Sequence, residues 1–326
     1  MKKVIFIDSV HPILAEKLEK AGYQCDWKIE LSRVKILPIL KDYEGAVIRS
    51  KFKFDTEVFE AAPNLKWIAR SGAGMENIDQ AEAQKLGVKC FNSPEGNRDA
   101  VAEHALGMIL SLFNNLKRSD TEVRQGQWNR EKNRGLELKG KTVGILGYGY
   151  MGEAFAKRLQ GFGVKVIAYD KYKSDFGNEL VQEVSLEAFF LQTEILSIHL
   201  PLTEETTFMI NESFLNQFAN DLFVINTARG KNVRTEDLVS ALRSGRVKGA
   251  CLDVLEYEKL SFEGLKANEL PQAFQYLRQA ENVVLTPHVA GWTQESYIKL
   301  SEVLAEKIFK SHSIQLQGSS NLNNKM

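Results

Sequence analysis

Cysteine is scarce in this chain. Only Cys25, Cys90 and Cys251 occur among 326 residues, and their spacing matches no metal-binding pattern. An odd, sparse set in a long chain is typical of a reducing compartment, so we expect a cytoplasmic protein and no metal site. Each cysteine is expected to be a small core residue rather than a nucleophile.

The chain also lacks an excess of charge and any long apolar run. Lys plus Arg equals Asp plus Glu at 42 each, and no basic tract occurs of the kind that follows a nucleic acid backbone. No apolar run approaches the ~20 residues of a membrane span. The apolar run within the first eight residues is too short for a signal peptide, and its pattern predicts a strand. We therefore expect no nucleic-acid partner and no membrane association.

Short β-branched runs alternate with helical stretches along the chain. Continuous apolar strands joined by helical crossovers predict parallel sheets that are covered on both faces. At 326 residues there is room for two domains of ordinary size. The expected strands are 4–8, 46–50, 67–71, 88–92, 142–146, 165–170, 195–200, 222–226, 249–254 and 282–287.

A glycine-rich segment, 147–152, follows the strand expected at 142–146. It has the GxGxxG spacing and opens a helical stretch. Gly147 allows a tight turn, Gly149 admits a pyrophosphate close to the backbone, and Gly152 lets the helix pack against the strand. The N-terminus of the helix then favours phosphate. These features predict a dinucleotide site, and the alternative is an ordinary glycine-rich turn.

Asp170 ends the next expected strand, 18 residues after Gly152. At about this spacing a carboxylate reaches the adenosine ribose of a bound dinucleotide. The residue favours NAD over NADP because a carboxylate repels a 2′-phosphate, and the neighbouring Lys171 and Lys173 weaken this preference only slightly. The second half of the chain is therefore expected to bind NAD.

Three consecutive strands end in residues that could carry chemistry. Arg229 follows the strand at 222–226, the acidic segment 253–258 ends the next, and His288 follows the last. In an open parallel sheet, ligands bind at the carboxyl ends of the strands. Hydride transfer on a ketone or alcohol needs a cation for an anionic substrate, a proton donor and a group that tunes that donor. The three strand ends offer all of these.

The chain resembles the D-isomer-specific 2-hydroxyacid dehydrogenases, most closely the 3-phosphoglycerate dehydrogenase branch. The resemblance spans nearly the whole length. The matching segments are 47–50, 70–79, 92–97, 126–128, 138–142, 147–152, 199–203, 226–230, 252–258 and 287–288.

The fold class that we expect is α/β with two doubly wound parallel-sheet domains. One is a flavodoxin-like substrate domain formed by residues 1–96 and 294–326, and the other is a Rossmann NAD-binding domain, residues 97–293, inserted into it. The chain stops soon after its last expected helix, so we expect a short form without a C-terminal regulatory domain. An apolar helix expected at 97–117 is either a core helix or is covered partly by a second subunit, and the second alternative predicts a homodimer.

The resemblance implies a catalytic set of Arg229, Glu258 and His288. Arg229 would hold the substrate carboxylate and 2-oxo oxygen, because its planar fork suits bidentate contact. His288 would exchange the hydroxyl proton, with Glu258 as its acidic partner, and Glu256 is the alternative partner. The alternative for Arg229 is a surface arginine without a ligand, and the alternative for His288 is a structural loop histidine. A further histidine, His104, is expected to be structural.

The resemblance also implies two sets of binding residues. In the first, Asp253 would lie near the nicotinamide carboxamide. In the second, the glycine turn at 71–74 would offer backbone N–H groups to the substrate carboxylate. Arg49, Arg70 and Arg130 would either bind a substrate phosphate or form structural ion pairs. The cofactor-binding set is Gly147, Gly149, Tyr150, Met151, Gly152, Asp170, His199, Pro201, Thr227, Ala228 and Asp253, and the substrate-binding set is Arg49, Arg70, Ser71, Gly72, Ala73, Gly74 and Arg130.

The activity implied is NAD-dependent hydride transfer on a D-2-hydroxy acid. The first candidate substrate is D-3-phosphoglycerate, which gives 3-phosphohydroxypyruvate at the head of serine synthesis. A hydroxypyruvate/glyoxylate or D-lactate-type reductase is the alternative, and a non-catalytic NAD-sensing protein is a third interpretation. Relative to the family pattern, residues 260–280 form an insertion that is expected to contain a helix. This helix would cap the active site or cover a neighbouring subunit.

Overall fold

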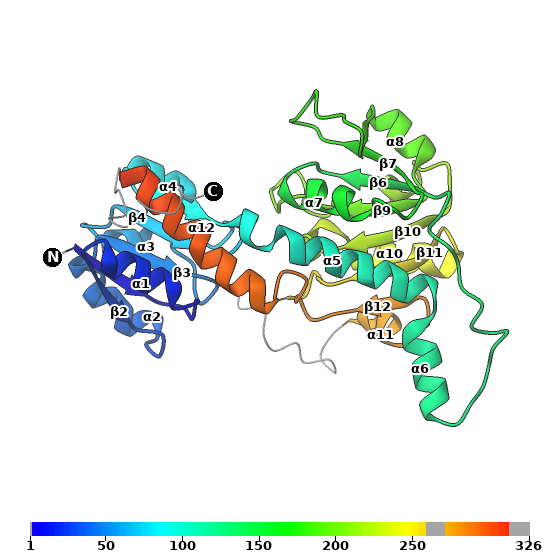
Figure 1. Ribbon diagram of the computed structural model, residues 1–326, viewed down its shortest axis with the longest axis horizontal. Coiled ribbons are helices and arrows are strands. Elements are labelled where there is room, and N and C mark those ends of the chain that lie inside the picture. The colour runs from blue at the N-terminus through cyan, green and yellow to red at the C-terminus, as the bar shows by residue number, and fades with distance from the viewer. Residues whose placement is uncertain (1, 259–270, 313–326) are drawn as a thin grey trace, which may run out of the picture. The chain divides into compact units, whose positions relative to one another are not determined.

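The computed structural model describes residues 2–258 and 271–312, which form two compact units (Figure 1). The first unit comprises Met1–Asn97 and Thr293–Met326, and the second comprises Arg98–Trp292, as far as these ranges are described. Each unit contains one sheet whose named strands all pair in parallel. The expected α/β fold class with two parallel sheets is confirmed.

The sheet of the first unit has five strands in the order β2-β1-β3-β4-β5, which is the flavodoxin-like order. Helices cover both faces. On one face α12 packs against α1, and Leu304 and Ile308 are buried with Phe6 and Trp67. The strands are β1 Lys2–Phe6, β2 Tyr23–Trp27, β3 Gly45–Ile48, β4 Trp67–Arg70 and β5 Lys89–Asn92, and the helices are α1 Ile13–Lys20, α2 Arg33–Ile36, η1 Leu37–Asp42, α3 Thr56–Glu60, α4 Gln80–Lys85 and α12 Gln294–His312.

The sheet of the second unit has seven strands in the order β12-β11-β10-β9-β6-β7-β8. The order reverses between β9 and β6, as in a Rossmann fold. Its strands are β6 Thr142–Leu146, β7 Lys165–Tyr169, β8 Gln182–Glu183, β9 Ile195–Ile198, β10 Leu222–Asn226, β11 Val247–Leu252 and β12 Val283–Leu285. The remaining helices are α5 Pro94–Phe113, α6 Leu116–Arg124, α7 Tyr150–Arg158, α8 Leu186–Gln192, α9 Glu212–Leu215, η2 Gly230–Asn232, α10 Thr235–Ser244 and α11 Gln272–Gln279.

Two strands of the structure were not predicted. β2 lies at the edge of its sheet and is mostly half-buried, so it lacks the continuous apolar run that marked the others. β8 has only two residues and pairs with β7 at the other sheet's edge. Edge strands bury less apolar surface than central ones, so the hydrophobic pattern that reveals a strand is weaker there.

Two helices answer questions that the sequence left open. In α5, Ala102, Ala105, Ile109 and Phe113 are buried within the second unit, so this part of the helix is a core helix. The insertion contains α11, whose Phe274 and Leu277 are buried, and Leu277 belongs to the core that includes α10. Residues 260–270 of the insertion lie outside the described residues.

Candidate active site

The predicted catalytic and cofactor residues of the second unit gather at one edge of its sheet. Since all seven strands are parallel, their carboxyl ends lie on the same side, and the loops that follow them meet there. The loops carry the glycine segment after β6, Asp170 after β7, His199 after β9, Arg229 after β10, Asp253 after β11 and His288 after β12.

The glycine loop leaves open space where a ligand would lie. Gly147 has a φ of +90°, and a Cβ on Gly152 would lie 2.3 Å from the Gly147 oxygen, so both positions require glycine. A Cβ on Gly149 would meet nothing within 4 Å. Gly149 is therefore not needed for packing, but it keeps the N-terminus of α7 accessible, as a bound pyrophosphate requires. Tyr150 and Met151 form the first residues of that helix.

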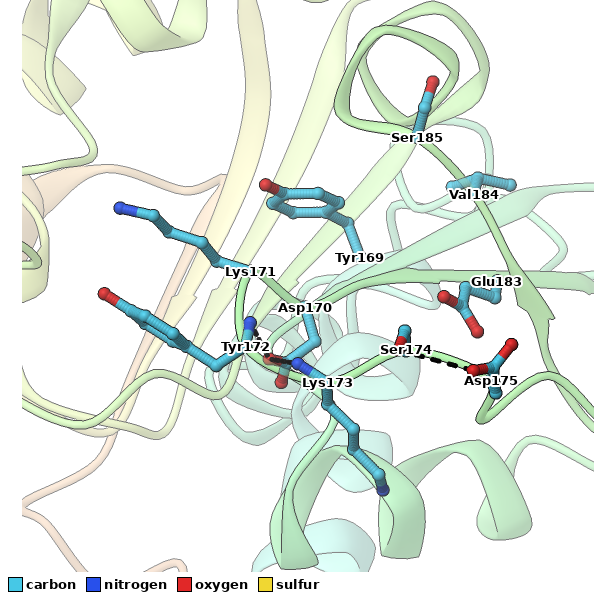
Figure 2. A pocket seen from close by; sticks show the side chains of 10 residues that line it. All are labelled: Tyr169, Asp170, Lys171, Tyr172, Lys173, Ser174, Asp175, Glu183, Val184 and Ser185. Carbon is cyan, nitrogen blue, oxygen red and sulfur yellow. Dashed lines mark hydrogen bonds between the residues drawn. The ribbon is translucent and has the colours of Figure 1, made fainter.

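Asp170 is held at the end of β7 by three backbone N–H groups. Its Oδ2 accepts from Tyr148 N at 2.8 Å, and its Oδ1 accepts from Tyr172 N at 2.9 Å and Lys173 N at 3.1 Å. Because an ionised carboxylate accepts about four hydrogen bonds, one further acceptor position remains for a ribose hydroxyl. Residues 169–175 and 183–185 line an open cavity of about 600 Å³, and the Asp170 carboxylate lies at the backbone of Tyr172 and Lys173 (Figure 2). Its volume is in the usual range for a site that holds a small ligand.

His199 and Pro201 follow β9 and are part of the framework behind the glycine loop. Ser197 Oγ and His199 Nε2 share a hydrogen bond of 2.8 Å. Burial lowers the pKa of His199 to about 4, so its imidazole is neutral at pH 7. The Pro201 oxygen accepts from Thr206 Oγ1 and from Asn232 Nδ2. The neutral histidine suits a wall of the site rather than proton exchange.

His288 and Glu258 form a close pair. The His288 Nδ1 and Glu258 Oε2 atoms are 2.6 Å apart, and the two side chains are 21% and 15% exposed. The other carboxylate oxygen of Glu258, Oε1, accepts from Leu255 N. An ionised carboxylate can only accept, so Nδ1 carries a proton, and the ring nitrogen that can change its protonation is Nε2. This is the arrangement of an acid/base histidine with an orienting acid.

Glu256 has a different function in the structure. Its Oε2 accepts from Thr235 N at 2.8 Å, at the first residue of α10. A carboxylate at this position satisfies a helix N-terminal donor and interacts favourably with the positive end of the helix. The structure therefore pairs Glu258, and not Glu256, with the histidine.

The Arg229 loop is pressed against the loop that contains Glu258. Arg229 N donates to Asn232 Oδ1 at 3.1 Å, and the Arg229 oxygen accepts from Asn226 Nδ2 at 3.0 Å. A Cβ on Gly230 would lie 2.0 Å from both the carbonyl carbon and the oxygen of Leu255. Only glycine permits this approach, which fixes the arginine loop beside the 255–258 segment.

Asp253 is 1% exposed and organises the loop of His288. Its Oδ1 accepts from Thr286 Oγ1 at 2.6 Å and from Val289 N at 2.9 Å, and its Oδ2 accepts from Ala290 N at 2.9 Å. These contacts leave one acceptor position of the carboxylate for a ligand amide. In the part of the chain that is described, Thr227 Oγ1 is buried and has no hydrogen-bond partner. An unsatisfied hydroxyl next to Ala228 and Arg229 fits a polar ligand group.

The predicted substrate-binding residues of the first unit lie at the ends of β3 and β4. Arg70 is buried and its Nε donates to the Arg49 oxygen at 3.2 Å, which is a structural contact. In the glycine turn, Ser71 N donates to the Ile48 oxygen and Gly72 N donates to Ser93 Oγ. The N–H groups of Ala73 and Gly74 have no partner among the described residues, so they are the better candidates for a ligand contact. Arg130 belongs to the second unit and is exposed.

Three residues of this region carried no signal that sequence reasoning used. Gly230 was one glycine in a motif, Thr286 was one residue before Pro287, and His104 was expected only to be structural. In the structure, His104 Nε2 lies 3.0 Å from Thr286 Oγ1 and 3.6 Å from Asp253 Oδ1. Contacts between α5 and the end of β12 link positions 182 residues apart, and no local spacing reveals them.

Comparison with known proteins agrees with the geometry. The profile described as "D-isomer specific 2-hydroxyacid dehydrogenase, NAD binding domain" matches residues 106–290. D-3-phosphoglycerate dehydrogenase of Archaeoglobus fulgidus is 34% identical over 308 residues, which are 94% of this chain and 56% of that protein. Hydroxypyruvate reductase of Thermotoga maritima is 35% identical over 280 residues, which are 86% of this chain and 88% of that protein. The chain thus spans about half the length of the phosphoglycerate dehydrogenase and most of the reductase.

Solved structures show the same likeness over the whole chain. D-2-hydroxyisocaproate dehydrogenase has a TM-score of 0.81 at 28% identity, covering 99% of this chain and 100% of that one. D-lactate dehydrogenase from Aquifex aeolicus, in complex with NAD and lactic acid, has a TM-score of 0.79 at 27% identity, covering 97% of both chains.

The glycine loop, the Asp170 carboxylate and the unsatisfied Thr227 hydroxyl fit a dinucleotide, and the matching profile is that of an NAD-binding domain. The expected cofactor, NAD, is therefore confirmed, as is the family resemblance. The chain belongs to the D-isomer specific 2-hydroxyacid dehydrogenase family.

Proposed function

We propose that Arg229, Glu258 and His288 are the catalytic residues of an NAD-dependent dehydrogenase that interconverts a D-2-hydroxy acid and its 2-oxo acid. The observation that carries this proposal is the 2.6 Å contact between His288 and Glu258. With Nδ1 directed to Glu258, proton exchange is assigned to His288 Nε2, at the same sheet edge as the arginine loop and the glycine loop.

Each residue has a defined step. When bound by the glycine loop and Asp170, NAD would supply the hydride acceptor for the oxidation, and NADH the hydride donor for the reduction. Arg229 binds the substrate carboxylate and the 2-oxo oxygen through its guanidinium fork. His288 donates a proton from Nε2 to that oxygen in the reduction and removes it in the oxidation. Glu258 holds the ring in one orientation and stabilises the imidazolium while it is doubly protonated.

D-3-phosphoglycerate, oxidised to 3-phosphohydroxypyruvate for serine synthesis, is our first candidate substrate. It is supported by the relatives of that name, and Arg49 and Arg130 remain predicted to bind the substrate phosphate because their charges suit it. Arg70 supports it less, because it is buried and contacts the Arg49 carbonyl. Ser71, Gly72, Ala73 and Gly74 remain predicted to meet the substrate carboxylate.

Hydroxypyruvate or glyoxylate is the second candidate. The observation in its favour is the Thermotoga maritima hydroxypyruvate reductase, which is 35% identical to this chain over 280 residues. A D-lactate-type substrate is supported by the likeness to the D-lactate dehydrogenase structures of Aquifex aeolicus and Treponema pallidum.

A homodimer is also proposed, through a surface adjacent to the one that was predicted. The buried residues of α5 pack within the second unit, whereas Leu116, Val123, Trp128 and Leu136 are between 49% and 82% exposed. Large apolar side chains exposed on α6 and the segment after it are typical of a surface that another subunit covers. A monomer in light scattering at micromolar concentration would contradict this proposal. None of the described helices is long and apolar enough to cross a membrane, and the cytoplasmic location remains a prediction.

A panel of substrates tests the function. NADH oxidation would be measured with 3-phosphohydroxypyruvate, hydroxypyruvate, glyoxylate and pyruvate, and NAD reduction with D-3-phosphoglycerate and both enantiomers of lactate. We expect turnover of at least one 2-oxo acid and oxidation of D-acids only. The phosphorylated pair should give the highest kcat/KM if phosphoglycerate is the substrate. No turnover of any acid by folded, NAD-binding protein would favour the NAD-sensing alternative.

A further inference from the structure

His104 is a titratable side chain that has no place in the proposed mechanism. It lies on α5, is 25% exposed, and contacts Thr286 at the end of β12. Thr286 in turn contacts Asp253, the buried carboxylate at the end of β11. Side chains from three separate elements therefore meet behind the loop that carries His288.

The direction of these hydrogen bonds follows from the carboxylate. Asp253, when ionised, can only accept, so the Thr286 hydroxyl proton points to Asp253 Oδ1 at 2.6 Å. The oxygen of that hydroxyl is then an acceptor, and His104 Nε2, 3.0 Å away, must donate. The result is a chain of hydrogen bonds from His104 through Thr286 to Asp253, and Thr286 Oγ1 also lies 3.8 Å from Met108 Sδ.

This chain ends on the backbone of the proposed acid/base residue. His288 has a φ of +57°, a left-handed conformation that is uncommon for any residue except glycine. His288 N donates to the Asp253 oxygen at 2.7 Å, while Val289 N and Ala290 N donate to the Asp253 carboxylate. Asp253 thus binds three consecutive N–H groups and holds the turn that aims the imidazole at Glu258.

We infer that His104 and Thr286 are positioning residues, which fix Asp253 and through it the backbone of His288. The inference rests on the proposed function, because it assigns His288 the proton transfer. The Thr286 hydroxyl is a side-chain donor to this carboxylate beside Val289 N and Ala290 N, and His104 Nε2 holds that hydroxyl in place. Asp253 is 1% exposed, so water does not replace a lost donor. Without the Thr286 hydroxyl the carboxylate moves to find another donor, and the N–H groups of Val289 and Ala290 that bind it move with it.

Two pairs of variants test this inference. Thr286→Val has nearly the shape of threonine but removes the hydroxyl, and Thr286→Ser restores it. His104→Phe removes the donor N–H at the helix surface, and His104→Gln restores a donor. A displaced catalytic group costs about tenfold to hundredfold in rate, so we expect Thr286→Val to lower kcat by that factor.

The KM values separate positioning from a general loss of structure. KM for the best 2-oxo acid of the panel should change less than about threefold in all four variants, because no proposed contact of the substrate carboxylate is removed. Thr286→Ser and His104→Gln should recover most of the lost kcat. The double variant Thr286→Val/His104→Phe should be no slower than Thr286→Val alone, since either change interrupts the same chain.

A measurement on the cofactor-free protein supplements the kinetics. In ¹⁵N-histidine-labelled protein, the Nδ1 proton of His288 is identified by its loss in His288→Asn, a residue that tolerates a positive φ. This signal should shift or broaden in Thr286→Val and return in Thr286→Ser. An unshifted signal together with an unchanged kcat in Thr286→Val, or equal damage by serine and valine, would overturn the inference.

The two proposals fail differently. Wild-type kcat in folded His288→Asn would overturn the catalytic role of the histidine, whatever the Thr286 variants do. An inactive His288→Asn with fully active Thr286→Val and His104→Phe would leave the proposed function standing and overturn the positioning chain alone.

Discussion

Replacing Glu258 by Gln should slow the reaction without changing the shape of the site. The carboxylate accepts from two donors at once, His288 Nδ1 on Oε2 and Leu255 N on Oε1. The amide of Gln has one acceptor oxygen and one NH₂ group, so it can satisfy only one of these donors. The other donor then faces an N–H group, and the imidazolium also loses its negative partner.

The size of the effect follows from the type of contact that is lost. A hydrogen bond to a charged group contributes about 1.5–3 kcal/mol, which corresponds to about a 10- to 150-fold loss in kcat at 1.36 kcal/mol per factor of ten. We expect this loss in both directions of the reaction, because Glu258 stabilises the same imidazolium in each. KM for NADH should change little.

The matched control is Glu256→Gln. It makes the same chemical change two residues away, at a carboxylate that contacts Thr235 N at the start of α10. It should lower stability by about 0.3–1 kcal/mol through the helix N-terminus and leave kcat within about twofold of wild type. Initial rates of NADH oxidation and urea unfolding curves measure both quantities. If Glu258→Gln retained full kcat, or if Glu256→Gln were equally slow, the pairing of Glu258 with His288 would have no catalytic role.

Three further predictions follow from single positions. Gly230→Ala should lower kcat/KM by about 100-fold and the free energy of unfolding by about 1–3 kcal/mol, because its Cβ would lie 2.0 Å from Leu255 backbone atoms. Wild-type kinetics in this variant would show that the Arg229 loop and the 255–258 segment need not be in contact. Gly149→Val should leave Tm unchanged, because a Cβ at this position meets only open space, but it should raise KM for NADH at least about tenfold, because the side chain would occupy the space proposed for the pyrophosphate. Unchanged NADH binding in calorimetry would contradict pyrophosphate binding at this loop. Burial lowers the pKa of His199 from 6.5 to about 4, so as pH falls below 6.5 the unfolded chain binds a proton before the folded one does. Between pH 7.5 and 4.5 wild type should therefore lose about 2–3 kcal/mol more stability than His199→Gln. Parallel pH profiles in urea unfolding would contradict it.

The sequence was sufficient for the fold class because both sheets are built from central strands with continuous apolar runs. β9, Ile195–Ile198, is buried at every residue and was visible as such. β2 and β8 were not, because edge strands bury less and carry a weaker pattern. The extra strands leave the parallel, doubly wound architecture unchanged.

The catalytic candidates were visible because each follows a strand and matches a family segment. The family resemblance favoured Glu258, but the spacing alone could not exclude Glu256, since both residues follow β11 and their side-chain contacts depend on how one loop turns. The contact between His104 and Thr286 could not be predicted either, because it joins a helix to the end of a strand that is distant in the sequence. The sequence indicates which residues reach the sheet edge, and the three-dimensional structure is needed to tell which of them touch.

A crystal structure with NADH and oxamate, an unreactive analogue of a 2-oxo acid, tests the central claim most directly. The account predicts that the Arg229 guanidinium contacts the oxamate carboxylate and that His288 Nε2 lies within about 3.2 Å of the 2-oxo oxygen. Oxamate bound beside the nicotinamide with either side chain too far away to contact it would contradict the account.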